Sequence, residues 1–274
     1  MRRALRLHKP VFPRLVALFA SLYVAIRLPA FLSLADLRAS SFEPVGILWS
    51  LRSPLPNSAW FGVLGLLFVS GLVVLTGRAT RPAMAVFAPC VLVVTTYRSS
   101  WGQLLWFENL LVIHLIVLTV AVVIGPIGEN RLPPWAMQWC AVATVVLYML
   151  AGVAKLRYGG SAWISGDVLA HHIGYSSARL SVFGERPPLL ASFAVNHTGA
   201  LAVASFTTVA LELVAPLALL RRCLAVVWST AMWAMHVGIA LTMAVAFPYP
   251  IVGLAFVPVI AVAGFTSPRR AAPK

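Results

Sequence analysis

Long runs of apolar residues are the feature that most constrains how this chain can fold. The segment Ser58–Thr76 contains no charged side chain and has about the 20-residue length that an α-helix needs to cross a bilayer. Similar runs recur along the chain, and 61% of its 274 residues are hydrophobic while only 10% are charged. This composition excludes a soluble enzyme, a disordered chain and a disulfide-stapled secreted domain. It predicts an integral membrane protein with several spans.

The apolar runs predict an all-α fold, namely a polytopic membrane helix bundle with about eight transmembrane helices. The third and eighth runs are short, so an arrangement with seven spans stays open. Residues 1–274 are expected to form a single transmembrane domain, because no internal repeat or appended soluble domain is visible. The expected spans are about Phe12–Leu34, Ser58–Thr76, Pro82–Tyr97, Leu104–Gly125, Pro134–Leu156, Ala200–Leu220, Leu224–Phe247 and Ile251–Phe265.

Basic residues predict the orientation in the membrane. If the N-terminus is inside, thirteen lysines and arginines fall on the inner side and six on the outer side. Positive charge accumulates in cytoplasmic loops, so both termini are expected on the cytoplasmic side of the cell membrane. The net charge of +14 is then a property of membrane loops and not a sign of nucleic-acid binding. The longest loop, residues 157–196, lies outside, and loops of this length are usually functional.

The sequence predicts neither a metal centre nor a thiol centre. The three cysteines have no CxxC spacing and lie in or beside apolar runs, as small packing residues do. His171 and His172 are adjacent in the outer loop, but neighbouring histidines rarely face one ion. Two stretches of that loop, Val168–Ile173 and Ala178–Phe183, are expected as short interfacial helices.

Several ionisable residues lie in or at the ends of apolar runs: Glu108, His114, Lys155, Glu212 and His236. A charge at the bilayer centre costs about 2.5–3.5 kcal/mol on insertion scales, so these side chains are expected to face the bundle interior. Glu108 and Lys155 both fall near outer span ends, which predicts one shared outward-facing polar pocket. Simpler interpretations stay open: Lys155 can snorkel to the interface, Glu212 can tie helices together, and the histidines can be core residues.

A spaced motif lies in the stretch Leu147–Leu169. An aromatic residue is followed by Ala-Gly-x-x-Lys-Leu, a short gap and Trp-x-x-Gly, here Tyr148, Ala151, Gly152, Lys155, Leu156, Trp163 and Gly166. This pattern resembles the membrane region of vitamin K-dependent gamma-carboxylases and their bacterial relatives, the horizontally transferred transmembrane (HTTM) family. Weaker similarities lie in LELVAPLALL around Glu212 and in HVGIALTMAVAFPYP around His236.

The resemblance implies a chemistry for this site. Lys155 occupies the position of the carboxylase base, which deprotonates a reduced naphthoquinone that then reacts with oxygen to form an epoxide. A neutral lysine in an apolar site suits that role. The expected ligand is therefore a membrane quinol such as menaquinol. The implied catalytic residues are Lys155, His236 and Glu212, and the implied substrate-binding residues are Glu108, Asn109, Tyr148, Trp163 and Gly166.

The chain departs from the carboxylases in two respects. No counterpart of their large luminal peptide-binding domain is expected within residues 1–274. In FENLLVIHL, Leu110 follows Glu108-Asn109, where the carboxylases have a histidine after an Asn pair. Quinol binding or oxygenation is therefore expected more than glutamate carboxylation. The alternative is a non-enzymatic membrane subunit for maturation or export of a secreted peptide or protein, in which Lys155 and Glu212 pair structurally. A transporter is a weaker third option, because no inverted repeat is visible.

Overall fold

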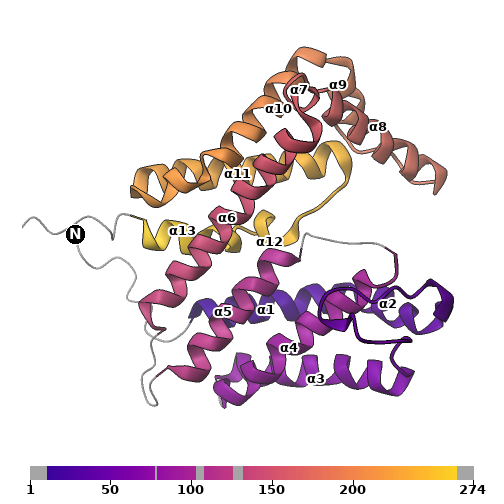
Figure 1. Ribbon diagram of the computed structural model, residues 1–274, viewed down its shortest axis with the longest axis vertical. Helices are drawn as coiled ribbons and strands as arrows, with labels where there is room; N and C mark the ends of the chain where they lie inside the picture. Colours follow the sequence, from indigo (N-terminus) through magenta and orange to yellow (C-terminus); the bar gives the residue numbers. More distant parts are fainter. Residues whose placement is uncertain (1–10, 78, 103–107, 126–131, 264–274) are drawn as a thin grey trace, which may run out of the picture. The chain divides into compact units, whose positions relative to one another are not determined.

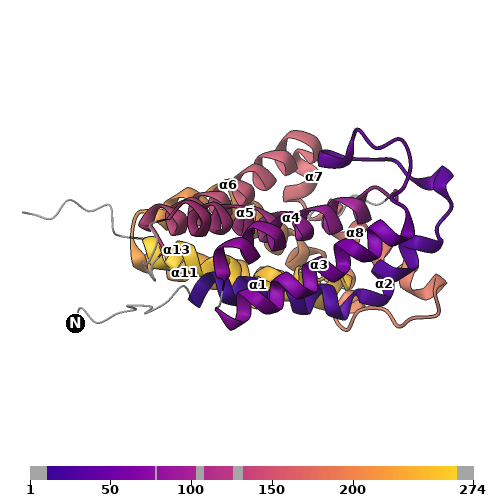
Figure 2. The same cartoon turned by 90° about the horizontal axis from the view of Figure 1, so that it is seen from below.

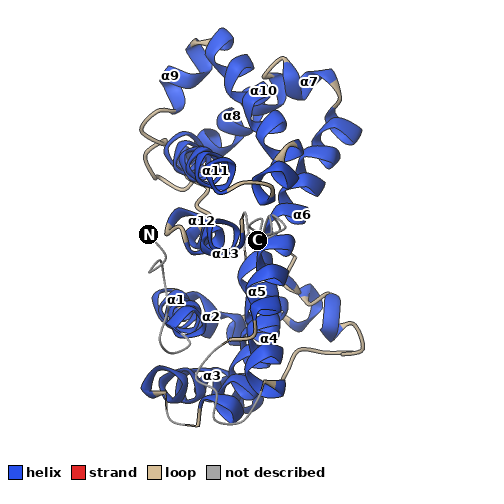
Figure 3. Cartoon of the chain, turned by 90° about the vertical axis from the view of Figure 1, so that its left-hand side faces the viewer, coloured by secondary structure: helices blue, strands red, loops and turns tan. Residues whose placement is uncertain are grey.

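The computed structural model describes residues 11–77, 79–102, 108–125 and 132–263, and all regular secondary structure in these ranges is helical (Figure 3). The predicted all-α class is thus confirmed for the described residues. By its internal contacts the chain divides into two compact units, residues 1–136 (unit 1) and residues 137–274 (unit 2).

The described residues of unit 1 before Pro134 form five α-helices and three short 3-10 turns. Helices α3 and α5 both pack against α1 and α4 (Figure 1 and Figure 2). The chain bends by 68° between α1 and the α2 segment, so the first expected span is broken in two. Gly77, with a φ of 73°, ends α3 in the left-handed conformation that closes many helices. The elements are α1 (Val11–Ile26), α2 (Leu28–Leu32), η1 (Ser33–Asp36), η2 (Ala39–Ser41), η3 (Gly46–Leu48), α3 (Asn57–Thr76), α4 (Thr80–Ser99) and α5 (Asn109–Ile124).

Unit 2 begins within a long helix, α6. This helix starts at Pro134, shortly before the boundary between the two units. Helix α10 packs against α7, α8, α9 and α11, and α11 also contacts α8, α9, α12 and α13. Prolines start several of these elements, because a residue without a backbone N–H is tolerated in the first helical turn. The elements are α6 (Pro134–Gly159), α7 (Ser161–Ile164), α8 (Asp167–Val182), α9 (Ala191–Asn196), α10 (Thr198–Leu213), η4 (Ala215–Leu219), α11 (Arg222–Met243), α12 (Pro248–Ile251), η5 (Leu254–Phe256) and α13 (Val257–Val262).

Four of the described helices, α3, α4, α6 and α11, are long and apolar enough to cross a membrane. The bent α1–α2 pair is a fifth candidate if it counts as one span, and α5 and α10 are apolar but shorter. Large apolar side chains such as Leu72 on α3 and Val227 on α11 are exposed. Long helices can expose apolar faces when they are surrounded by lipid, because lipid tails are apolar themselves. The helices therefore support the predicted membrane protein.

Besides the broken first span, further expected segments differ in the structure. Helix α4 is a full-length span candidate, because Pro82 lies in its first turn and does not interrupt it. In the outer loop, one continuous helix, α8, runs through the two stretches for which separate short helices are predicted. The eighth expected span starts at the end of α12 and is divided into η5 and α13, because Gly253 adopts a φ of 79° and Pro258 lies in the first turn of a new helix. Residues 104–107 and 264–265 of the expected spans lie outside the described residues.

Candidate functional site

Lys155 of α6 and Glu212 of α10 form an ion pair in unit 2. The Nζ atom of Lys155 lies 2.5 Å from Oε1 and 2.6 Å from Oε2 of Glu212. The side chain of Glu212 is only 4% exposed and that of Lys155 is 20% exposed. The two opposite charges thus compensate each other at a place that is largely shielded from solvent. Two residues that the sequence singles out separately are brought together by the packing of α6 on α10.

Glycine and tryptophan residues of the motif shape the surroundings of this pair. A Cβ atom on Gly152 would lie 3.0 Å from the Cβ of Glu212, so the small residue permits the close approach of α10. The Nζ atom of Lys155 lies 5.3 Å from the ring centre of Trp163, within the range of a cation–π contact. The hydroxyl of Ser205 donates a hydrogen bond to the carbonyl oxygen of Trp163 and ties α7 to α10.

Tyr148 of α6 and His236 of α11 form a second polar contact in unit 2. The hydroxyl oxygen of Tyr148 lies 2.6 Å from Nε2 of His236, and both side chains are buried. The ring centres of Trp228 and Phe256 lie 5.5 and 6.1 Å from that of Tyr148, so apolar rings surround the contact. Residues seven positions apart share one face of a helix, and Tyr148 and Lys155 therefore lie on the same side of α6.

The backbone conformation and close packing at position 166 explain why this residue is a glycine. Its φ is 88°, in the left-handed region that glycine adopts without strain. A Cβ atom there would lie 2.8 Å from the backbone nitrogen of Ala202 and 2.9 Å from the carbonyl carbon of Leu201. The turn between α7 and α8 thus passes directly over the backbone of α10. The expected role of Gly166 in substrate binding stays a prediction.

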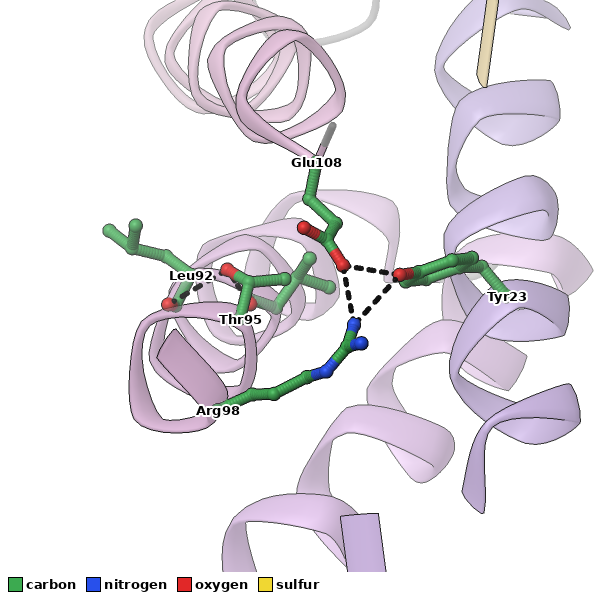
Figure 4. A network of polar contacts seen from close by, with 6 residues as sticks. Tyr23, Leu92, Thr95, Arg98 and Glu108 are labelled. Atoms are coloured by element: carbon green, nitrogen blue, oxygen red, sulfur yellow. Dashed lines mark hydrogen bonds and ion pairs between the residues drawn. The ribbon is translucent and has the colours of Figure 1, made fainter. Parts of the chain in front are cut away.

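Glu108 belongs to a separate polar network in unit 1 (Figure 4). Its Oε1 accepts a hydrogen bond from the Tyr23 hydroxyl of α1 and lies 2.9 Å from Nη1 of Arg98 of α4. The same Arg98 nitrogen lies 3.3 Å from the Tyr23 oxygen. Glu108 is buried immediately before α5, whereas Asn109, the first residue of α5, is exposed. The network therefore joins α1, α4 and the start of α5.

His114 and His171 occupy ordinary positions in the structure. His114 is buried in unit 1, with its ring centre 6.5 Å from that of Phe12, as expected for a core histidine. The Nδ1 atom of His171 lies 2.7 Å from the backbone oxygen of Asp167 on the same helix. No group of three or more His, Cys, Asp and Glu side chains is arranged to hold a metal ion in the described ranges.

The sequence analysis did not single out several residues that take part in the polar and aromatic contacts of the two units. Arg98 is one of the six basic residues counted on the outer side. A basic residue at the end of one span and an acidic residue at the start of the next are a signal for pairing, and this signal could have found it. Tyr23 and Trp228 were not singled out, because nothing in the local sequence separates them from other aromatic residues in apolar runs. The indole of Trp228 donates to the backbone oxygen of Leu211, which fixes α11 against the end of α10.

Comparison with known proteins adds no further constraint on the site. No family model, curated protein or solved structure matches this chain. The residues, their spacing and the geometry of the polar contacts therefore carry the functional argument.

Proposed function

We propose that this chain is a multi-span membrane enzyme of the HTTM type, which acts on a membrane quinol through Lys155 and Glu212. The observation that carries the proposal is the ion pair itself, a partly shielded lysine held by both oxygens of a buried carboxylate. Its surroundings support the proposal, because Tyr148, Gly152 and Trp163 of the lysine motif all lie in unit 2 near this pair or on the same face of α6.

The Lys155–Glu212 pair is suited to accept a proton from a substrate hydroxyl group. The pair is neutral overall before the transfer and carries one positive charge afterwards, while the substrate oxygen becomes negative. Opposite charges side by side in a medium of low dielectric constant attract each other strongly, which favours the transfer. Lys155 passes one ammonium proton to the Glu212 carboxylate, and the freed amine takes the proton of the substrate hydroxyl. Lys155 is thus the proposed general base, and Glu212 holds the proton that the lysine releases.

The proposed substrate is a reduced naphthoquinone such as menaquinol, with molecular oxygen as the oxidant. In the overall reaction the quinol loses two hydrogen atoms and gains one oxygen atom as an epoxide, and the second oxygen atom leaves as water. The residues around the Tyr148–His236 contact fit a flat ring that carries oxygen atoms. Trp228, Phe247 and Phe256 supply aromatic faces, and buried His236 supplies a ring nitrogen without a partner among the described residues.

The proposal includes eight spans in the cell membrane, with both termini inside. It is supported by the four long apolar helices, the bent α1–α2 pair and the shorter α5 and α10, and residues 248–263 would form a broken eighth span. Basic residues fall thirteen to six on the two sides in this arrangement. The end of α6 with Lys155 and residues 157–196 then face outward. Expected partners are membrane lipids, the quinol and a secreted peptide or protein.

A second candidate function is a non-enzymatic membrane subunit for maturation or export of a secreted peptide or protein. The ion pair favours this alternative as well, because a lysine engaged by both oxygens of a carboxylate joins α6 to α10 without any substrate. Removal of Lys155 is expected to destabilise the protein under either function, because it leaves the buried Glu212 carboxylate unpaired. The two functions differ in the activity of the folded protein: the wild-type enzyme forms epoxide, whereas a non-enzymatic subunit forms none.

Oxygen-dependent epoxidation of a naphthoquinol by the purified protein in nanodiscs tests the proposal, with the epoxide measured by mass spectrometry. Lys155→Met is compared with Arg157→Met, which removes an exposed cation two residues further along α6. Epoxide is expected from the wild type and from Arg157→Met, but not from folded Lys155→Met. Epoxide formation by Lys155→Met would reject the proposed role of the lysine as base. If the folded wild type forms no epoxide, the proposed enzymatic function is rejected.

A further inference from the structure

The imidazole of His236 uses only one of its two ring nitrogens. Nε2 lies 2.6 Å from the Tyr148 hydroxyl, whereas Nδ1 is buried and has no hydrogen-bond partner among the described residues. His236 is only 4% exposed and lies within α11, one of the candidate spans. Buried polar atoms in proteins almost always have partners, and hydrocarbon offers none. Nδ1 therefore points to a partner that this part of the chain does not supply.

Tyr148 determines which nitrogen of His236 carries the proton. A phenol hydroxyl is protonated near neutral pH, and His236 is its hydrogen-bond partner in the described part of the chain. When the hydroxyl donates to Nε2, the proton of the neutral imidazole lies on Nδ1. The opposite tautomer leaves both the Tyr148 hydrogen and the Nδ1 lone pair without partners. The contact thus favours an Nδ1–H donor that needs an acceptor.

We infer that the Nδ1–H group of His236 donates a hydrogen bond to an oxygen atom of the bound substrate and that Tyr148 fixes its orientation. A quinone or quinol oxygen supplies such an acceptor on a flat apolar ring. The ring of Phe247, centred 4.9 Å from the imidazole, provides an apolar neighbour for that ring. The chemical identity of the acceptor rests on the proposed function, whereas the need for an acceptor rests on the burial of Nδ1.

Two amide substitutions separate the roles of the two nitrogens. His236→Asn keeps an N–H donor near the position of Nδ1 and loses the contact with Tyr148. His236→Gln keeps a polar group near the position of Nε2 and loses the donor at Nδ1. One lost hydrogen bond corresponds to about tenfold weaker binding, which is expected for His236→Gln. His236→Asn is expected to bind within about threefold of the wild type, because it retains the donor.

Binding of 2-methyl-1,4-naphthoquinone to the full chain in nanodiscs tests the inference, with nitrogen-15 NMR of labelled histidines as the readout. The His236 signal is assigned by its disappearance in His236→Gln. The expected result is an Nδ1–H tautomer whose signal shifts when the quinone binds, together with weaker binding by the glutamine variant.

The possible outcomes distinguish this inference from the proposed function. An Nε2–H tautomer, or an Nδ1–H signal that does not change at saturating quinone, overturns the inference and leaves quinone binding in place. Failure of the folded wild type to bind the quinone overturns both. Binding without epoxidation by Lys155→Met, combined with the expected shift at His236, supports both.

Discussion

Gly152 of α6 faces Glu212 of α10 so closely that a methyl group at Gly152 would lie 3.0 Å from the Cβ of Glu212. The same helix contact brings Nζ of Lys155 within 2.6 Å of both oxygens of that carboxylate. The glycine and the lysine of the motif, three residues apart, are therefore two parts of one helix–helix contact. Gly152 allows α10 to approach α6 closely, and Lys155, one helical turn further along, reaches the carboxylate of Glu212.

Gly152→Ala is expected to destabilise the protein by about 1–3 kcal/mol, because the added methyl group forces α6 and α10 apart. Gly238→Ala in α11 is the matched control, since nothing lies within 4 Å of a Cβ at Gly238. Alanine at an open helical position is expected to stabilise by about 0.5–1 kcal/mol. Unfolding in mixed detergent micelles measures both. Equal effects at the two glycines contradict the close contact.

The Lys155–Glu212 pair is expected to show strong energetic coupling. Lys155→Met and Glu212→Gln each remove one partner of a shielded pair, and we expect about 3 kcal/mol of destabilisation for Lys155→Met, which leaves a buried carboxylate alone. The double variant is expected to lose less than the sum of the single losses, with a coupling of about 1–3 kcal/mol. A double-mutant cycle on unfolding free energies checks this. Additive losses mean that the two groups are not paired.

The network in unit 1 is expected to depend more on Arg98 than on Tyr23. Tyr23→Phe removes one hydrogen bond to Glu108, for an expected loss of about 1 kcal/mol. Arg98→Met leaves the buried Glu108 carboxylate without its cation and is expected to cost about 3 kcal/mol. Arg52→Met, at an exposed position, serves as the control and is expected to change the unfolding free energy by less than about 0.5 kcal/mol. A larger effect of Tyr23→Phe contradicts this order.

The proposed orientation predicts which cysteines react from each side of the membrane. Cys90 and Cys140 are buried, whereas Cys223 is exposed at the start of α11, on the proposed inner side. A membrane-impermeant maleimide is therefore expected to label Cys223 only after cells are permeabilised. Ser181→Cys, placed at an exposed position of α8 in a Cys223→Ser background, is expected to react in intact cells. The reverse pattern rejects the orientation with both termini inside.

The candidate residues of the site could be found in the sequence, but their pairings could not. A polar or charged group in an apolar run carries a local penalty, which is why Lys155, Glu212 and His236 stand out. The partners of Lys155 and Tyr148 lie 57 and 88 residues away along the chain. Glu108 pairs in the structure with Arg98, only ten residues before it, and its predicted pocket shared with Lys155 stays a prediction.

The helical class and the positions of the apolar helices follow from the sequence by itself. Within hydrocarbon a backbone must satisfy its own hydrogen bonds, so a long apolar run has few alternatives to a helix. Only the tertiary structure decided where the helices break, as after Ile26 and at Gly253, and which polar side chains meet. These outcomes depend on contacts between residues far apart in the chain, where one missing Cβ at Gly152 determines whether a carboxylate comes within reach of Lys155.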